Sequence, residues 1–163
     1  MSGLPIRRWP DPILSRPCAP VADPQAVAGL AADMLETMYA APGRGLAAPQ
    51  IGHAIRLFVM DVAWKDGAPD PFICVNPSII AHAAETVAGP EACLSIPGVT
   101  AEVPRSPWIV LRWTTPEGVL HEQRLDGAAA ICAQHEQDHL DGIVTFDRVS
   151  SEARRALEAD YAG

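Results

Sequence analysis

The 163-residue chain is long enough for one domain with a full hydrophobic core, and a hydrophobic content of 48% is ordinary for a globular protein. Its formal net charge of −8 argues against a protein whose main partner is a nucleic-acid backbone. No stretch has the apolar length of a signal peptide or a membrane span, and four cysteines without paired spacing favour free thiols in a reducing cytosol. We therefore expect a single cytoplasmic domain over residues 1–163, with no membrane partner and no nucleic-acid binding site.

The first quarter of the chain predicts an extended segment followed by a helix. Residues 1–22 are rich in proline, which favours an extended path over the surface. Asp23 and Pro24 then form an N-cap followed by a proline at the first helical position. Apolar residues recur behind them at helical spacing until Pro42 and Gly43 end the helix. These apolar positions are Val27, Leu30, Ala31, Met34, Leu35 and Met38.

The middle of the chain predicts strands. Residues 56–62 and 72–76 have the apolar and β-branched content of strands, and a loop over residues 64–71 separates them. Pro77 is expected to end the second strand, because proline cannot donate a ladder hydrogen bond. Residues 108–125 predict a hairpin around a central Pro-Glu-Gly turn.

The C-terminal end predicts one extended segment and one short helix. Residues 144–149 are expected to be extended, and the serine pair at 150–151 to cap a helix that ends near Tyr161. Strand segments mixed with a few separate helices point to the α+β fold class rather than to a doubly wound sheet.

Residues 134–140, which read Gln-His-Glu-Gln-Asp-His-Leu, lie on the most clearly predicted helix of the chain. Asp126 is a good N-cap, the alanines at 128–130 are strong helix formers, and Gly142 is placed to end the helix just past the motif. Apolar residues and the two histidines share one helical face, which we expect to point inward.

The two histidines of this helix can bind one metal ion. Since residues four apart lie one above the other on a helix, His135 and His139 can each offer a nitrogen to the same ion. Glu136 then reaches a metal-bound water rather than the metal, which is the position of a general base. The alternative is two core histidines that only satisfy each other, and a complete His-Glu-x-x-His on a capped helix argues against it.

Two turn-rich stretches are further candidates for a site. Residues 43–52 combine glycines and small residues, which allow a ligand close to the backbone, with the side-chain amide of Gln50. Residues 89–98 are bracketed by Gly-Pro and Pro-Gly, and we expect a turn-bounded segment with Cys93 at its centre. Neither stretch is specific alone.

A catalytic zinc-like centre needs a third protein ligand and an open position. Metzincin-type proteases place a third histidine six residues after the second, where this chain has Thr145, a poor ligand. Thermolysin-type proteases use a glutamate on a following helix, and Glu158 stands at a plausible distance on the short terminal helix. The remaining source is a cysteine earlier in the chain.

Among the cysteines, Cys93 is the best candidate for the third ligand. Cys18 falls in the proline-rich segment expected at the surface, and Cys74 falls inside an apolar strand, where it belongs to the core. Cys132 lies one turn before His135 on the same helix, a position more typical of a pocket wall than of a ligand.

Three stretches together resemble the peptide deformylase family, whose patterns read Gly-x-Gly-Leu-Ala-Ala-Pro-Gln, Glu-Gly-Cys-Leu-Ser and Gln-His-Glu-x-Asp-His-Leu. Here they stand at residues 43–50, 91–95 and 134–140, in the same order and at similar spacing. Further matches at residues 7–14 and at Asp147-Arg148 extend the resemblance over nearly the whole chain. Three motifs in order are far more specific than any one of them.

The resemblance implies the α+β fold of that family, with mixed, mostly antiparallel strands around a central helix. It implies that Cys93, His135 and His139 bind one divalent metal ion and that Glu136 is the general base. Ferrous iron is the expected ion, and zinc, nickel or cobalt can substitute. The implied reaction is hydrolysis of the N-formyl group from the N-terminal formylmethionine of newly made polypeptides, with release of formate. The implied partners are these nascent chains, with transient ribosome contact.

The same resemblance assigns the residues around the substrate. The backbone N–H of Leu94 and the side-chain amide of Gln50 stabilise the oxyanion. The peptide runs along Arg44-Gly45-Leu46 and adds a strand through backbone hydrogen bonds that ignore its side chains. Ile131 and Cys132 line the pocket for the N-terminal methionine.

Three residues depart from the family pattern. Arg44 stands where an aliphatic residue is usual, and Thr100 where many bacterial members carry a peptide-contacting arginine. Ala92 replaces the glycine before the cysteine, and a positive φ at this position would cost about 1–2 kcal/mol.

These departures motivate a second hypothesis, a deformylase-like amidase acting on a different N-acyl peptide or small substrate. A third hypothesis is a thermolysin-like protease that uses Glu158, and a fourth is a non-catalytic binding protein stabilised by metal. The presence of Glu136 and Gln50 argues against a non-catalytic role.

Overall fold

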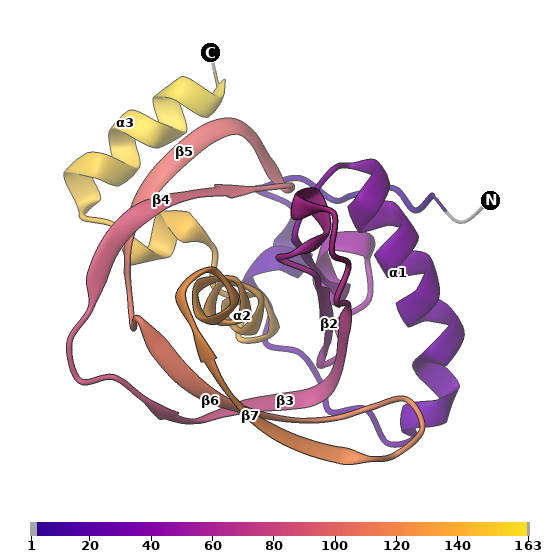
Figure 1. Cartoon of the computed structure of the whole chain (residues 1–163). Helices are drawn as coiled ribbons and strands as arrows, with labels where there is room; N and C mark the ends of the chain where they lie inside the picture. Colours follow the sequence, from indigo (N-terminus) through magenta and orange to yellow (C-terminus); the bar gives the residue numbers. More distant parts are fainter. Residues whose placement is uncertain (1–2, 163) are drawn as a thin grey trace.

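One helix, α2 (Gly127–Leu140), runs through the middle of the molecule, and the strands and the other helices surround it (Figure 1). The structure is a computed structural model and describes residues 3–162. The apolar side of α2 packs against the sheet through Ala130, Ala133 and Leu140, all of which are fully buried. The α+β class expected from the sequence is confirmed.

A five-stranded antiparallel sheet forms the main support of α2. Its spatial order is β1-β2-β3-β6-β7, so β1 and β7 are its two edge strands. The strands are β1 (Gly45–Ala47), β2 (Leu57–Met60), β3 (Phe72–His82), β6 (Trp108–Thr114) and β7 (Leu120–Asp126). Figure 1 shows β3, β6 and β7 passing beneath α2. The hairpin expected over residues 108–125 is confirmed as β6 and β7.

Both faces of this sheet are covered near β2, which explains why β2 is a continuous apolar run rather than an alternating one. Phe58 and Met60 pack in the cluster that contains α2. Leu57 and Val59 point the other way and pack under helix α1 (Ala28–Ala40). Successive side chains of a strand therefore serve two different hydrophobic clusters.

Helix α1 is preceded by a 3-10 turn over Pro24–Val27. The Asp23 carboxylate accepts a hydrogen bond from the Gln25 backbone N–H at 3.2 Å, and Pro24 occupies the first helical position, as expected from the sequence. The buried face of α1 carries Met34 and Met38, both from the predicted apolar stripe.

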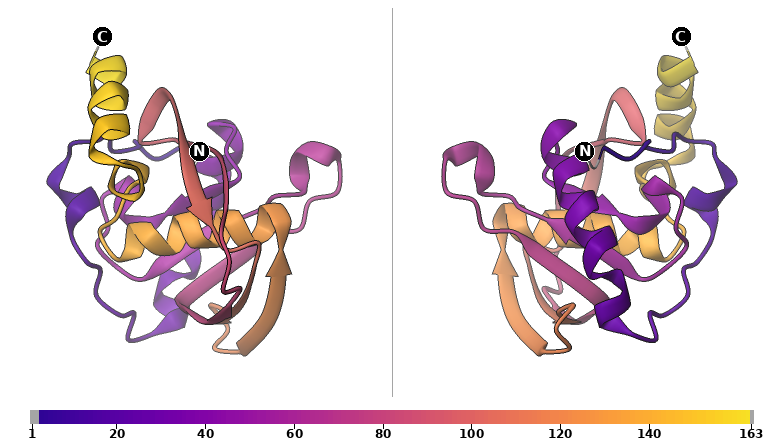
Figure 2. Two further views of the ribbon diagram at one scale, coloured as in Figure 1. Left: turned by 90° about the vertical axis from the view of Figure 1, so that its left-hand side faces the viewer. Right: turned by 90° about the vertical axis from the view of Figure 1, so that its right-hand side faces the viewer.

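A second sheet is a long hairpin of β4 (Val87–Cys93) and β5 (Ile96–Arg105). The terminal helix α3 (Ser151–Ala162) packs beside β5, at the end of the molecule shown uppermost in Figure 2. The prediction that turns bound a segment over residues 89–98 is wrong. Residues 89–93 belong to β4 and residues 96–98 to β5, and the turn lies between the two strands. Cys93 lies at the last position of β4.

Two further expectations about secondary structure are wrong. The strand beginning at Phe72 does not end at Pro77 but continues to His82 as β3. A register shift between Val75 and Ser78 accommodates the proline, so no ladder hydrogen bond is needed from its nitrogen. Residues 144–149 are not extended either. They contain a 3-10 turn, where the Asp147 carboxylate accepts the Val144 N–H at 2.9 Å.

Two expectations about individual side chains also need correction. Asp126 occupies the N-cap position of α2, but its carboxylate makes no cap hydrogen bond and instead pairs with Arg124 at 3.1 Å. Cys18 is not a surface residue. It is 8% exposed and packs in the cluster around α2, where its backbone N–H binds the Leu140 carbonyl.

Gly142 ends α2 as the sequence predicts, and the structure shows why glycine is needed. Its φ is +76°, a left-handed conformation that side-chain-bearing residues adopt at a cost. A Cβ at this position would also lie 2.9 Å from the carbonyl carbon and oxygen of Ser15. The end of α2 is therefore fitted closely against the N-terminal segment.

The helices found among residues 3–162 are too short or too polar for any of them to cross a lipid bilayer.

Candidate metal centre

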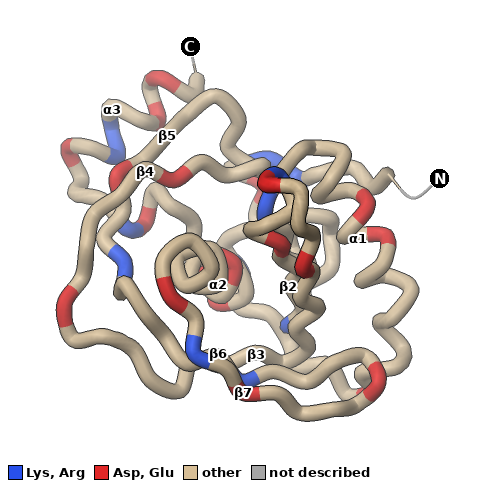
Figure 3. Tube along the Cα trace, in the orientation of Figure 1, with Lys and Arg blue, Asp and Glu red and all other residues tan. Residues whose placement is uncertain are grey.

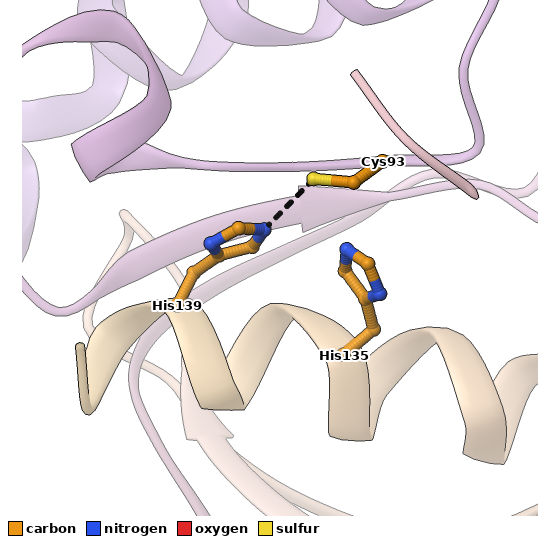
Figure 4. Close-up of side chains that lie close together, drawn as sticks. All are labelled: Cys93, His135 and His139. Carbon is orange, nitrogen blue, oxygen red and sulfur yellow. Dashed lines mark hydrogen bonds between the residues drawn. The ribbon is translucent and has the colours of Figure 1, made fainter. Parts of the chain in front are cut away.

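Cys93 and the two histidines of α2 meet below the β4–β5 turn. Their candidate ligand atoms all lie within 4.8 Å of one another (Figure 4). The Cys93 Sγ is 3.4 Å from His139 Nε2, and the two imidazole centroids are 5.0 Å apart. Helix α2 thus supplies two donors one turn apart, and the end of β4 supplies the third.

This donor set fits a single divalent ion. Thiolate and imidazole are the usual protein ligands of zinc and are also suited to iron, and three such donors leave a position open. All three side chains are buried, so water cannot readily supply hydrogen bonds to their polar atoms. Burial lowers the pKa of His139 well below its usual value, and the neutral imidazole is the form that binds metal.

The electric field around His135 also favours a cation. Burial alone would lower the pKa of His135, but the neighbouring Glu136, Cys93 and Glu91 outweigh it and raise the pKa well above its usual value. The same neighbouring groups that stabilise a proton on His135 also stabilise a metal cation bound near this ring.

Glu158, the thermolysin-like candidate for the third ligand, is not part of this group. Glu158 lies on α3, where its carboxylate pairs with Arg154 at 2.8 Å. Thr145, at the position of the metzincin histidine, is buried in the 3-10 turn after α2, and its hydroxyl is a poor ligand.

A buried network of charges supports the centre. The His135 Nδ1 lies 3.0 Å from the Glu91 carboxylate, which also receives two hydrogen bonds from Arg105 at 2.8 and 2.9 Å. Arg105 reaches on to Asp138 at 2.6 Å, and Arg148 closes the network on Asp138 at 2.7 Å. Burial alone would raise the pKa of Glu91, but the bonds from Arg105 and His135 lower it, so the carboxylate stays charged.

The Glu91 carboxylate fixes the orientation of His135. A ring N–H donated from Nδ1 leaves the lone pair of Nε2 as the one that could bind a metal ion. Sequence reasoning gave Glu91 no role, although it stands two residues before Cys93 in a recognised motif. Nothing local indicates that it faces α2, because the contact depends on how β4 crosses that helix.

We expect Glu91→Gln to weaken metal affinity about 10–100-fold, because the amide holds His135 less firmly and leaves Arg105 partly uncompensated. Glu102→Gln, an exposed glutamate on β5, is the matched control and should leave the affinity unchanged. Metal titration monitored with a competing chelator measures both. Equal affinities for wild type and Glu91→Gln would show that Glu91 does not support the centre.

Glu136 lies beside the three donors on the same helix. It is 4% exposed, and its Oε1 has no hydrogen-bond partner among the described residues. Burial raises the pKa of Glu136 to about 7. A carboxylate with this pKa can both take and return a proton near neutral pH, which is what a general base requires.

Gly45, the first residue of β1, lets the backbone pass directly over Glu136. A Cβ at this position would clash with the Glu136 carboxylate and lie 2.8 Å from the Cys132 sulfur. The requirement for glycine therefore comes from the site and not from backbone conformation.

We expect Gly45→Ala to lower kcat/KM about 10²-fold, since the added methyl must displace the Glu136 side chain. Gly29→Ala is the control, because a Cβ there meets nothing within 4 Å. Peptide hydrolysis assays and thermal melts of both variants separate a local effect from loss of folding. Activity of Gly45→Ala near that of wild type would contradict the close approach described here.

The side-chain amide of Gln50 faces the Cys93 sulfur. Its Oε1 accepts the Ala47 N–H at 2.9 Å, and its Nε2 donates to the Ser95 hydroxyl at 3.0 Å. The Nε2 lies 3.6 Å from the Cys93 Sγ. These contacts fix the amide with one N–H on the Ser95 hydroxyl and the other directed at the Cys93 sulfur. Leu94, the other predicted donor, follows Cys93 directly, at the β4–β5 turn.

A cavity of about 420 Å³ leads from the surface to these groups. Its lining contains most of the residues predicted for the site and the substrate: Gln50, Cys93, Leu94, His135 and Glu136, together with Arg44, Gly45, Ile131 and Cys132. His139, the remaining ligand candidate, is buried and is not part of the lining.

Leu46 is the predicted substrate residue that does not line the cavity. Its side chain is fully buried in the cluster under α1, which leaves only its backbone for a peptide. Cys132 stands in the wall, 3.5 Å from the Arg44 carbonyl oxygen. Burial and the charge of Glu136 raise the pKa of Cys132 well above its usual value, so it remains a thiol.

The backbone at Ala92 carries no left-handed strain. Among the described residues other than glycine, only Asn76 has a positive φ. Ala92 lies in β4, paired with Thr100 of β5, so the cost considered for this substitution does not arise.

An antiparallel sheet packed on a helix, with two histidines, a cysteine and an adjacent buried glutamate at the floor of a cleft, is the arrangement of a mononuclear metal-dependent hydrolase. The profile of the Polypeptide deformylase family matches residues 4–155. The chain belongs to this family, a family of enzymes.

Curated relatives agree with this assignment. A peptide deformylase of Mesorhizobium japonicum is 43% identical over 147 residues, which cover 90% of this chain and 84% of the relative. One from Alkalilimnicola ehrlichii is 44% identical, covering 96% of this chain and 88% of the relative.

Solved structures share the fold. The peptide deformylase of Thermus thermophilus superposes with a TM-score of 0.90 at 41% identity, covering 98% of this chain and 95% of that one. A peptide deformylase from Synechococcus elongatus, crystallised with actinonin, gives a TM-score of 0.93 at 32% identity, covering 99% of this chain and 89% of that one.

Proposed function

We propose that this protein removes the N-formyl group from the N-terminal formylmethionine of newly made polypeptides and releases formate. The observation that carries the proposal is the convergence of Glu136 and Gln50 on the Cys93, His135 and His139 group at the floor of the cavity. A binding protein has no need of a buried carboxylate with a pKa near 7 beside such a group.

The substrate is proposed to bind by strand addition. β1 is an edge strand of the five-stranded sheet, and Gly45 of this strand lines the cavity. A peptide paired with β1 uses backbone hydrogen bonds, which do not depend on its side chains. Ile131 and Cys132 on α2 line the wall facing the formylated residue. Such binding suits an enzyme that acts on many different nascent chains.

The metal ion is proposed to be held by Cys93, His135 and His139, and when bound it supplies a Lewis acid that activates water at neutral pH. Glu136 takes the proton of the attacking water and returns it to the departing amine. The Gln50 side-chain N–H and the Leu94 backbone N–H donate to the oxygen that becomes negatively charged, each contributing about 10²–10³ in rate. Glu91 and Ser95 hold His135 and Gln50 in place during these steps.

We propose ferrous iron as the resident ion, with zinc, nickel or cobalt able to replace it. Because a thiolate beside ferrous iron is open to oxidation, activity of the iron-loaded protein is expected to decay in air, whereas the nickel-loaded protein keeps its activity. Time courses of activity in air and under argon measure this. Equal decay for both metals would contradict the proposed sensitivity of the iron form.

The proposed cellular setting is the cytoplasm, with transient contact at the ribosome where the substrates emerge. Helix α3 is accessible for such a contact, but it carries three acidic residues and two arginines, so strong attraction to RNA is not expected from it.

The test is an anaerobic assay of iron-loaded protein on formyl-Met-Ala-Ser, beside acetyl-Met-Ala-Ser and formyl-Glu-Ala-Ser. Rapid release of formate from the first peptide alone supports the proposal. Preferred hydrolysis of the acetyl or the glutamyl peptide would favour the amidase with another N-acyl substrate, and absence of turnover of all three would contradict both.

A further inference from the structure

The exposed mouth of the cavity carries positive charge and no negative charge. The exposed residues of the lining are Pro42, Arg44, Lys65, Pro90, Ala92 and Ala128. Two of these six are cations and none is an acid. The lining also contains Glu91 and Glu136, but both are buried at the floor. This distribution stands out in a chain of net charge −8 whose only lysine is Lys65.

The segments carrying these two cations are fastened to each other. The Trp64 indole N–H donates to the Gly43 carbonyl at 2.9 Å, and the Asp61 N–H donates to the Arg44 carbonyl at 2.8 Å. The Lys65 ammonium lies 5.7 Å from the centre of the Trp64 ring. The loop before β3 and the segment before β1 therefore form one rim. The same loop also carries the exposed Asp66 and Asp70, which do not line the cavity. Further acidic positions are spread over the helices, hairpins and loops (Figure 3).

Neither cation forms an ion pair with a described residue of the protein. Within residues 3–162, no carboxylate lies within ion-pair distance of the Arg44 guanidinium or the Lys65 ammonium. Arginines in other places do have such partners, as Arg56 has in Asp141 at 3.0 Å. The rim thus offers two unpaired positive groups to whatever enters the cavity.

We infer that Arg44 and Lys65 select formylated chains with an acidic side chain at the second or third position. The inference rests on the proposed function, and it names the substrate class that this rim favours. A peptide extended along β1 from the floor advances about 3.3 Å per residue, so the residues after the formylmethionine pass the rim next to Arg44. A carboxylate there meets two cations, and a lysine meets two like charges.

The test compares amidated peptides, in which no terminal carboxylate can bind the rim. The series is formyl-Met-Ala-Ser with aspartate or lysine placed at position two or three. At low salt we expect kcat/KM to be about 2–5-fold higher with aspartate than with the neutral residue, and about 5–20-fold higher than with lysine, at one or both positions. Near 1 M salt the differences should vanish, because the screening length falls to about 3 Å.

Variants assign the effect to the rim. Arg44→Leu combined with Lys65→Met should abolish the preference, whereas Arg155→Leu, an exposed arginine of α3 outside the lining, should keep it. Equal kcat/KM for acidic, neutral and basic peptides would overturn the inference while leaving the deformylase activity intact. A preference that survives in the double variant would overturn it as well.

A second measurement does not depend on turnover. The Kd values of the same peptides for metal-loaded Glu136→Gln should follow the same order, with aspartate tightest and lysine weakest. If no formylmethionyl peptide is hydrolysed by the wild type, the proposed function fails, and this order of Kd values still decides the charge selection. Kd values independent of peptide charge would overturn it.

Discussion

Replacing Glu136 with glutamine is expected to lower kcat about 10²–10⁴-fold while metal content and peptide affinity stay close to those of wild type. Glutamine keeps the size of the side chain and its hydrogen-bonding shape, but it cannot accept a proton from water. The carboxylate is buried beside Cys93, His135 and His139 without belonging to that group, so its loss should not release the metal.

Metal content, peptide Kd and kcat should be measured on one preparation of Glu136→Gln. Glu85→Gln, an exposed glutamate between β3 and β4, is the matched control and should behave as wild type. Unfolding or metal loss with little specific effect on turnover would indicate a structural role. If metal-loaded Glu136→Gln turns over within a few-fold of wild type, the Glu136 carboxylate is not the general base.

Replacing Cys93 with alanine is expected to abolish tight metal binding, and activity with it. Two imidazoles remain after this change, but the negatively charged donor is lost, and two neutral ligands hold a divalent ion far more weakly than three donors including a thiolate. Elemental analysis after dialysis against a chelator should show about one ion per chain in the wild type and nearly none in Cys93→Ala.

Two controls make the metal result specific. Cys132→Ala removes the thiol of the cavity wall, which we expect to remain protonated, and it should keep its ion. Glu158→Gln removes the glutamate that a thermolysin-like protease would need, and it should also keep its ion. Metal loss in Glu158→Gln with retention in Cys93→Ala would contradict the assignment of the third ligand.

Local sequence signals predicted the helices of this fold well. The Asp23 cap and the apolar periodicity after it indicate the helical segment that leads into α1. The apolar periodicity before Gly142 and the glycine itself indicate α2, close to its observed bounds. Such signals depend on neighbours within a few residues, so contacts with distant segments of the chain do not change them. The failures involve distant partners. Pro77 did not end β3, because a register shift against β6 absorbs it.

The residues of the candidate site also fall into those that local motifs indicate and those that depend on distant partners. The motifs indicated the residues that meet at the cavity floor, including a cysteine some forty residues before the histidines. The network from Glu91 through Arg105 and Asp138 to Arg148 could not be found in this way. Each of these charges is ordinary in its own segment, and only the crossing of β4 and β5 over α2 brings them together in a buried place.

The most direct test of the central claim is intact mass measurement on a purified polypeptide that retains its N-terminal formylmethionine. Incubation with catalytic amounts of the iron-loaded protein under argon should replace the formyl group of every chain by hydrogen, which lowers the mass by that of one carbon and one oxygen atom. It should also release an equal amount of formate and leave all internal peptide bonds intact. An unchanged mass, or fragments from internal cleavage, would contradict the proposed deformylation.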